Sequence, residues 1–201
     1  MTHSKINKVG LGKMFFPQGC PYCNSDVLFR KFSEVFDGGD PDDTIYICSN
    51  ADCMAYTLGH RDTKGGAVKD YPQGVIANKQ LRDAHDLLRS KFSPLWMDNK
   101  IKFIYRDFIV KYIDENQEEC VGIADRFSSE GTYKIYNEDK SVSLEVPALR
   151  VSKVNTRTKA YFWLALKMGM TYQDCKIPML NLEDTSRAIG IIDEATQQLN
   201  I

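Results

Sequence analysis

The stretch Gly19-Cys20-Pro21-Tyr22-Cys23, followed after 24 residues by Cys48-Ser49-Asn50-Ala51-Asp52-Cys53, decides how the N-terminal part of this chain folds. Two cysteines on one tight turn can direct both sulfurs at a single ion, and two such turns supply the four ligands that a structural Zn²⁺ site requires. Glycine, proline, serine and asparagine in and beside the two motifs favour such turns. The spacing therefore predicts a structural zinc ion held by Cys20, Cys23, Cys48 and Cys53.

Other interpretations of these cysteines stay open at this point. They could form two disulfides or stand as unrelated buried thiols, although paired, closely spaced cysteines in a reducing compartment indicate zinc more often than disulfides. His60, seven residues after Cys53, could replace one ligand. The remaining cysteines, Cys120 and Cys175, are isolated in the sequence and are expected to be packed thiols.

Composition excludes several classes of protein. The chain has 201 residues, 43% hydrophobic and 26% charged, with a formal net charge of −1, so no overall positive field draws it to nucleic acid or anionic lipid. The longest apolar run, residues 160–166, is far shorter than the roughly 20 residues that cross a bilayer. The N-terminus, MTHSKINKVG, lacks the apolar segment of a secretory signal. We expect a soluble, cytoplasmic protein with no membrane contact.

Turn-forming residues dominate the first third of the chain, with short β-prone runs at 26–31 and 44–48. Residues 79–92 then show apolar side chains at steps of three and four, which predicts an amphipathic helix. We expect Asn78 to cap this helix and Pro94 to end it.

The second half of the chain alternates between β and helical character. Strand-like segments at 103–112, 120–127, 132–136 and 141–146, with a turn and a last short strand after them, predict a small β-barrel of SH3-like or Tudor-like type. Helices are expected at 158–167, ending at Gly169, and from Asp184 or Thr185 onward. The fold class predicted is α+β: an N-terminal zinc ribbon and helices, with a small β-barrel inserted.

The segment GCPYCNSDV…IYICSNADCMAY resembles the zinc ribbons at the C-terminal end of type IA DNA topoisomerases. The wider arrangement resembles a zinc-finger-containing family of uncharacterised function from bacterial and phage proteins. Its ribbon is followed by segments like 72–85 and 92–96 here, then by segments like 157–165 and 175–179. This resemblance implies a zinc ribbon and no particular activity.

Two departures from the family pattern bear on domain organisation. The family-like segments stop at Trp96 and resume at Arg157, which predicts three parts: residues 1–97 as ribbon and helix, 98–154 as an inserted β-barrel, and 155–201 as helices that pack on the first part. Lys176 also stands where the family often has a histidine, which weakens the case for a second metal site beside Cys175.

No nucleophile elbow, phosphate-binding glycine loop or dinucleotide-binding motif is present in the sequence. We therefore expect a non-catalytic, zinc-binding recognition module, acting as a protein-interaction adaptor or regulator in nucleic-acid-related processes. Several aromatic side chains of residues 103–136 exceed what a small core needs and favour a protein partner.

The alternative function is direct binding of single-stranded nucleic acid by the ribbon. Aromatic rings would stack on bases, while lysine and arginine would follow the phosphates. The candidate residues for such an interface are Lys13, Phe16, Tyr22, Arg30, Lys31 and Tyr46, with Phe29 as a further ring. Residues 1–77 nevertheless hold eight basic and nine acidic side chains, which gives no dominant positive stripe.

Overall fold

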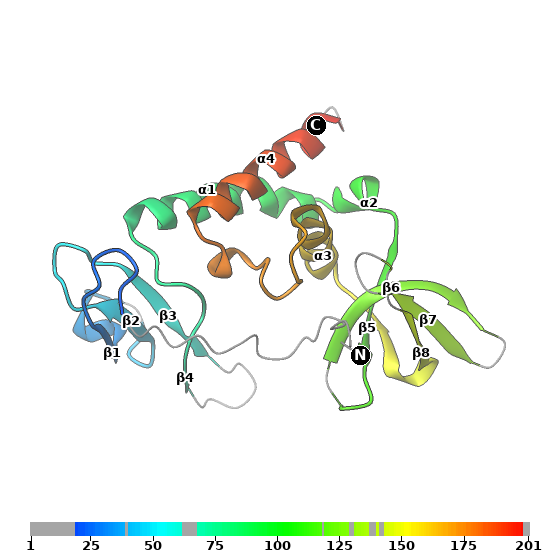
Figure 1. Ribbon diagram of the computed structural model, residues 1–201, viewed down its shortest axis with the longest axis horizontal. Coiled ribbons are helices and arrows are strands. Elements are labelled where there is room, and N and C mark those ends of the chain that lie inside the picture. The colour runs from blue at the N-terminus through cyan, green and yellow to red at the C-terminus, as the bar shows by residue number, and fades with distance from the viewer. Residues whose placement is uncertain are drawn as a thin grey trace. The chain divides into compact units, whose positions relative to one another are not determined.

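The computed structural model describes residues 19–38, 40–61, 68–117, 119–128, 131–136, 140 and 143–198, and Figure 1 shows their helices and strands. The chain divides into two compact units. Among the described residues, the ribbon unit contains those up to residue 88 together with 177–186. The sheet–helix unit contains 89–176 and the residues from 187 onward.

The ribbon unit is built on a four-stranded antiparallel sheet in the order β1-β2-β3-β4. Its strands are β1 (Val27–Lys31), β2 (Thr44–Cys48), β3 (Tyr56–Arg61) and β4 (Val68–Pro72), and the 3₁₀ helix η1 (Phe32–Glu34) follows β1. The two strands expected at 26–31 and 44–48 are confirmed. β3 and β4 were not predicted, because glycine, histidine and charged residues interrupt their apolar pattern.

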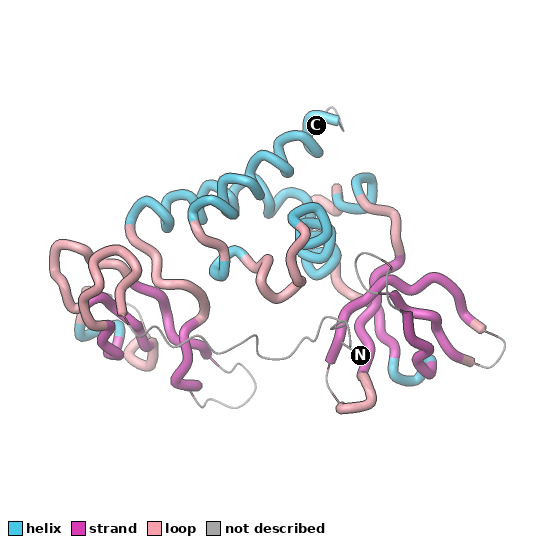
Figure 2. The backbone as a smooth tube through the Cα atoms, in the orientation of Figure 1, coloured by secondary structure: helices cyan, strands magenta, loops and turns pink. Residues whose placement is uncertain are grey.

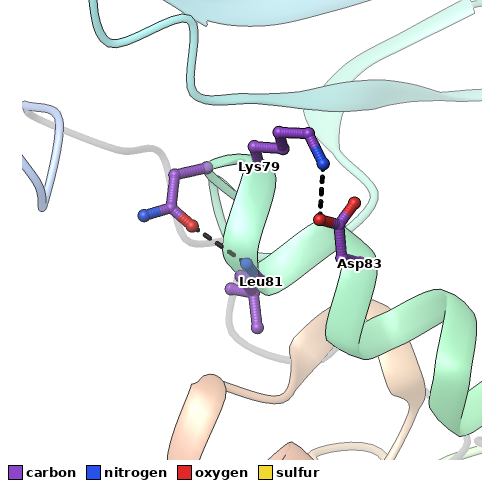
Figure 3. Close-up of polar contacts among 4 residues, drawn as sticks. Lys79, Leu81 and Asp83 are labelled. Atoms are coloured by element: carbon purple, nitrogen blue, oxygen red, sulfur yellow. Dashed lines mark hydrogen bonds and ion pairs between the residues drawn. The ribbon is translucent and has the colours of Figure 1, made fainter.

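Helix α1 (Lys79–Met97) begins as the sequence predicts. The side chain of Asn78 accepts a hydrogen bond from the Leu81 N–H at 2.9 Å, and Lys79 forms an ion pair with Asp83 at 2.6 Å (Figure 3). This is the N-cap arrangement that satisfies a free N–H at the start of a helix. The helix buries an apolar stripe, in agreement with the amphipathic pattern: Leu81, Leu88, Phe92 and Leu95.

The expected end of this helix at Pro94 is wrong. Pro94 lies inside α1, and its carbonyl accepts a hydrogen bond from the Asp98 N–H at 3.1 Å. Proline removes one helical donor and crowds the carbonyl four residues earlier, here that of Ser90. Ser90 lies on the exposed side of α1, where a helical carbonyl can tilt outward, so the helix continues for another turn.

Three further helices complete the helical part (cyan in Figure 2): α2 (Ile101–Ile104), α3 (Thr156–Met168) and α4 (Leu182–Gln198). In α3, the Asn155 side chain accepts from the Thr158 N–H at 2.8 Å, and Gly169 ends the helix with a φ of 63°. That left-handed conformation favours glycine, which confirms the predicted C-terminal end. α2 replaces the start of the strand expected at 103–112, and α4 begins earlier than expected, with Asn181 capping the Asp184 N–H at 2.8 Å.

The sheet–helix unit contains a five-stranded antiparallel sheet in the order β8-β7-β6-β5-β9. Its strands are β5 (Phe108–Ile113), β6 (Glu119–Phe127), β7 (Thr132–Tyr136), β8 (Ser143–Pro147) and β9 (Val151–Lys153), and the 3₁₀ helix η2 (Ala148–Arg150) joins β8 to β9. One face of this sheet forms a core around Val110, Tyr112, Cys120, Ala124, Ile135 and Val146. Among the described residues no pairing joins β8 to β9, so the strand ladder does not close into a barrel.

Contacts between helices order the rest of the sheet–helix unit. The rings of Phe92 and Tyr161 pack with their centroids 4.7 Å apart, and Lys91 pairs with Asp193 of α4 at 2.7 Å. The α+β class is therefore confirmed as a mixed structure with two antiparallel sheets. Within the described ranges, no helix combines the length and the apolar character needed to cross a bilayer.

Candidate metal centre

The first cysteine pair lies on a turn directly before β1. The Asn24 N–H donates to the Cys20 carbonyl at 2.9 Å, and the Cys20 N–H donates to the Ser25 carbonyl at 2.8 Å. Asn24 has a φ of 58°, a left-handed conformation that asparagine tolerates better than most residues. The turn therefore brings the Cys20 and Cys23 side chains to the same side of the chain.

The second pair encloses a turn that starts where β2 ends. The side-chain oxygen of Asn50 accepts a hydrogen bond from the Asp52 N–H at 2.9 Å. The backbone carbonyl of Asn50 accepts one from the Cys53 N–H at 3.1 Å. This asparagine side chain replaces a backbone acceptor and tightens the turn. The Cys48 N–H donates to the Ala55 carbonyl at 2.9 Å, which fixes both ends of the second motif.

The two turns bring four sulfurs together. Sγ of Cys20 lies 3.6 Å from Sγ of Cys53, and Sγ of Cys23 lies 3.4 Å from Sγ of Cys48. All four ligand atoms lie within 4.8 Å of one another. Tetrahedral Zn–S bonds of about 2.3 Å place sulfurs about 3.8 Å apart, so the cluster has the dimensions of a zinc site. All four cysteines are free thiols, and disulfides, with S–S near 2.05 Å, do not fit these distances.

The residues packed around the four sulfurs form a small apolar cluster. Cys20, Cys48, Ala55 and Ile76 form a buried cluster, with Val27 packed against it. The Tyr56 and Ala77 backbones exchange hydrogen bonds at 3.0 Å, which ties β3 to the segment that enters α1. A core this small gives little hydrophobic stabilisation, so the ion would provide much of the folding free energy of this region.

Burial and hydrogen bonding set the pKa values of three of the four thiols in the zinc-free chain. Burial has the larger effect at Cys48 and Cys53. Burial raises the pKa of the Cys48 thiol to about 12, and burial also raises the pKa of the Cys53 thiol. Hydrogen bonding to Ser25 instead lowers the pKa of the exposed Cys23 thiol to about 6. Cys23 is therefore the thiolate available first at neutral pH, whereas Cys48 must release a proton when it binds zinc.

The donor set also defines the chemistry. Four thiolates fill the tetrahedral coordination of Zn²⁺, whereas a catalytic zinc keeps one position for water or substrate. The residues present therefore fit a structural zinc ion. The side chain of His60, the alternative ligand, lies outside the described part of the structure.

The candidate nucleic-acid contacts fall in different environments. Lys13 and Phe16 lie outside the described residues. The ring of Tyr22 is 42% exposed, although its hydroxyl donates to the Ile76 carbonyl at 3.2 Å. Arg30 and Lys31 are exposed on β1. Tyr46 is only 7% exposed, and the Phe29 ring packs on it with centroids 5.0 Å apart.

Arg82 supports the metal centre in a way that sequence reasoning did not assign. Its guanidinium donates to the Ala77 carbonyl at 2.6 Å and to the Met54 carbonyl, next to Cys53, at 3.3 Å. It also lies 4.4 Å from the centroid of the Tyr56 ring. Arg82 belongs to the family-like segment after the ribbon, but only the fold reveals that it joins α1 to the second cysteine turn.

Comparison with known proteins agrees with this geometry. A family model described as a zinc-finger-containing domain matches residues 16–143, a range that includes all four cysteines and most of the segment 98–154. No curated protein and no solved structure matches the chain. The family match and the four-sulfur cluster together support a structural Zn²⁺ as the cofactor.

Proposed function

This chain belongs to the zinc-finger-containing domain family, and on that premise we propose that it is a non-catalytic recognition module. In this proposal the zinc ion holds the ribbon, and the ribbon binds an extended segment of a protein partner. The module acts as an adaptor or regulator in a nucleic-acid-related process. Its four free thiols need a reducing compartment, so we place it in the cytoplasm.

The observation that carries the proposal is the exposure of β1 at the edge of the ribbon sheet. Among the described strands, β1 pairs only with β2, and four of its five residues are exposed. Leu28 is 36% exposed and Phe29 is 42% exposed. An edge strand with exposed apolar side chains is a template for an added strand, as in peptide recognition by β-augmentation.

The hydrogen-bond register identifies the free backbone groups. The Ser49 N–H donates to the Asp26 carbonyl and the Phe32 N–H to the Asp43 carbonyl, each at 2.8 Å. In an antiparallel pair these bonds fall on alternate residues, so the backbone groups of Phe29 and Lys31 point away from β2. They can pair with an incoming strand.

The local charge favours a protein over a nucleic acid. Residues 19–61 hold three arginine or lysine side chains, Arg30, Lys31 and Arg61, against seven carboxylates. These carboxylates belong to Asp26, Glu34, Asp37, Asp40, Asp42, Asp43 and Asp52. Such a surface attracts basic side chains and repels a phosphate backbone, so we propose a peptide segment with positive charge.

The second candidate function is direct binding of single-stranded nucleic acid. The exposed rings of Tyr22 and Phe29 and the exposed cations of Arg30 and Lys31 favour it, as does the resemblance of the ribbon to those of type IA topoisomerases. Base stacking on exposed rings tolerates any sequence, and the two cations would follow the phosphates.

We propose further that the five-stranded sheet has an SH3-like or Tudor-like fold. Its order, β8-β7-β6-β5-β9, and the 3₁₀ helix η2 between β8 and β9 support this assignment. Phe108 of β5, 49% exposed, is an aromatic side chain available there for a protein partner. This second surface would make the module bivalent.

The test compares two defined probes on the zinc-loaded full chain, followed by the backbone amide resonances of β1. One probe is an extended peptide of alternating lysine and valine, and the other is a twelve-nucleotide oligothymidylate. We expect the peptide to shift the amides of Phe29 and Lys31. Phe29→Pro, which removes an outward N–H and no ladder bond, should abolish this shift, whereas Phe29→Ala should only weaken it.

The nucleic-acid alternative makes different predictions for the same chain. Replacing Phe16, Tyr22 or Phe29 with alanine should weaken oligonucleotide binding by about 1–3 kcal/mol each, whereas the buried Tyr46 should not contribute by stacking. Neutralising Lys13, Arg30 or Lys31 should make the slope of the logarithm of the binding constant against the logarithm of salt concentration shallower by roughly one unit each. Absence of oligonucleotide binding at about 50 mM salt discards this alternative, and absence of peptide binding discards the adaptor.

A further inference from the structure

The side chains of β1 alternate between the two faces of the ribbon sheet. Leu28 and Arg30 lie on one face of the strand, two residues apart. Asp26, directly before β1, continues the same row, because its carbonyl accepts a hydrogen bond from the Ser49 N–H at 2.8 Å and so extends the pairing with β2. One face of this edge therefore carries an acid, an apolar residue and a base in order along the chain.

The two charges of this row have no ion-pair partners within the chain. Neither the Asp26 carboxylate nor the Arg30 guanidinium forms a salt bridge with any of the described residues, and both residues are exposed. Leu28 between them is 36% exposed. In the opposite direction the row runs base, apolar residue, acid, so it is complementary to a second copy of itself that runs antiparallel.

The backbone of β1 limits which residues can face each other in such a pair. Hydrogen bonds to β2 use Asp26 and every second residue after it, so the N–H and C=O groups of Val27 and Phe29 point away from the sheet. A second β1 can bond to this edge when its Phe29 lies opposite Val27. The same register places Leu28 opposite Leu28 of the second copy, on a two-fold axis, and Asp26 opposite Arg30.

In this register the side chains would meet where an antiparallel pair brings them closest. The Leu28–Leu28 pair and the two Asp26–Arg30 pairs are non-hydrogen-bonded pairs, in which the Cα atoms lie about 4.5 Å apart. Opposite charges and apolar side chains that face each other across two strands stabilise the pairing. On the other face, Phe29, which is 42% exposed, would pack beside Val27 of the second copy.

The other registers are disfavoured by charge or by the backbone. A shift of two residues leaves Asp26 and Arg30 opposite uncharged residues, and a shift of four places Arg30 opposite Arg30 or Asp26 opposite Asp26. A shift of one residue places Val27 opposite a residue whose backbone groups already bond to β2. A parallel pairing in register would place Arg30 beside Arg30, and like charges in such positions are destabilising.

We propose that β1 pairs antiparallel with β1 of a second copy, with Leu28 on the two-fold axis and Asp26 facing Arg30 on either side of it. Such an interface is isologous, because both copies use the same surface. It covers an exposed edge strand that is otherwise open to uncontrolled pairing. The pairing rests on the same premise as the proposed function, namely that β1 accepts an added strand, so the second copy competes with the peptide partner.

The test is sedimentation of the zinc-loaded full chain at concentrations up to about 1 mM, a range that detects weak dimers. We expect a reversible dimer, and slower hydrogen exchange of the Val27 and Phe29 amides as the concentration rises. Asp26→Arg or Arg30→Asp should each weaken dimerisation about tenfold or more, because the two-fold axis repeats the repulsive pair. Asp42→Arg, the matched control, changes an exposed carboxylate outside β1 and should stay within about twofold.

Charge exchange separates the loss of pairing from damage to the fold. Mixing the Asp26→Arg chain with the Arg30→Asp chain in equal amounts should give a heterodimer, because every facing pair then joins opposite charges. A chain that carries both substitutions should dimerise again about as tightly as the wild-type chain. All of these variants should keep the zinc content of the wild-type chain, which reports that the ribbon is intact.

A wild-type chain that stays monomeric at about 1 mM, or a dimer that both charge reversals leave unchanged, would overturn the proposed pairing. The proposed function would survive either result if the lysine–valine peptide still shifted the Phe29 amide. The converse result is a dimer with the expected charge dependence whose β1 does not bind the peptide, even in the monomeric Arg30→Asp variant. The pairing would then stand, and the adaptor function would be wrong.

Discussion

Sγ of Cys23 lies 3.4 Å from Sγ of Cys48, although the two residues are 25 positions apart in the chain. One belongs to the turn before β1 and the other to the end of β2, which pairs with β1 in antiparallel register. The strand pairing Val27↔Cys48 positions the second motif beside the first. The zinc site is thus a tertiary feature, and neither cysteine turn can form it alone.

The first prediction is one zinc ion per chain. Protein purified in reductant should contain about one equivalent by elemental analysis, and a chelator should lower its melting temperature, because structural zinc contributes about 10–16 kcal/mol of apparent binding free energy in small zinc domains. Cys48→Ser should lose the metal, since a neutral hydroxyl cannot replace a buried thiolate ligand.

Cys120→Ala is the matched control for this prediction, because Cys120 is buried in the core of the five-stranded sheet and is not part of the four-sulfur cluster. This variant should retain the full zinc content. Less than about 0.3 equivalents in the wild-type chain, together with no effect of a chelator on stability, would contradict the assignment of a structural zinc.

The second prediction concerns protons. Burial raises the pKa of Cys48 to about 12, so at pH 7.5 this thiol carries its proton in the zinc-free chain and must release it to become a ligand. Zinc binding should therefore release protons, and its affinity should rise with pH. Calorimetry of zinc binding in two buffers of different ionisation enthalpy measures the release, and identical heats in both buffers would show that no proton leaves.

The four zinc ligands and the helices could be predicted from the sequence, because cysteine spacing and the period of apolar residues depend on local chemistry. Asn78 and Gly169 are used as caps, as predicted, whereas the cap at Asn155 places the start of α3 at Thr156, earlier than the expected residue 158. The errors came where tertiary context overrides a local preference. Pro94 does not end α1, since the carbonyl that its ring crowds, that of Ser90, lies on the exposed side of the helix.

The candidate interface was less accessible to sequence reasoning than the metal centre. An aromatic residue can stack on a base or pack in a core, and composition does not distinguish the two. Tyr46 was proposed as a base-stacking ring, yet its partner across the sheet is Phe29, which covers it.

The third prediction tests the close approach of two backbone segments in the ribbon unit. The Val75 N–H donates to the Pro178 carbonyl at 2.8 Å, and a Cβ on Gly74 would come within 2.5 Å of the Pro178 carbonyl carbon. Gly74→Ala should therefore destabilise the chain by about 1–3 kcal/mol in denaturant unfolding. The backbone of residue 178 cannot move aside without losing that hydrogen bond.

Gly190→Ala is the matched control, because a Cβ at this exposed position of α4 meets nothing within 4 Å. It should stabilise the chain by about 0.5–1 kcal/mol through helix propensity alone. If Gly74→Ala instead stabilised the protein as Gly190→Ala does, the contact between residues 74 and 178 would not exist in solution.

The fourth prediction concerns the proposed insertion of residues 98–154. All four cysteines and the contacts that support them lie in the ribbon unit, which contains no residue of that segment. A chain in which residue 97 is joined to residue 155 by a short glycine–serine linker should therefore keep one zinc equivalent. It should also keep the circular-dichroism signal of α1, α3 and α4, because the Phe92–Tyr161 contact and the Lys91–Asp193 ion pair do not involve the removed part.

The cost of this deletion comes from the few contacts that the segment makes with α3. The ring centroids of Tyr105 and Phe162 lie 6.5 Å apart, and Phe162 is fully buried. Removing residues 98–154, which include Tyr105, therefore exposes apolar surface on α3. A loss of about 1–3 kcal/mol is expected for uncovering one such side chain. Replacing Phe162 with threonine in the shortened chain should recover solubility without changing zinc content. A shortened chain that is insoluble or molten even with this replacement would show that residues 98–154 are part of the helical core, and the insertion hypothesis would then be wrong.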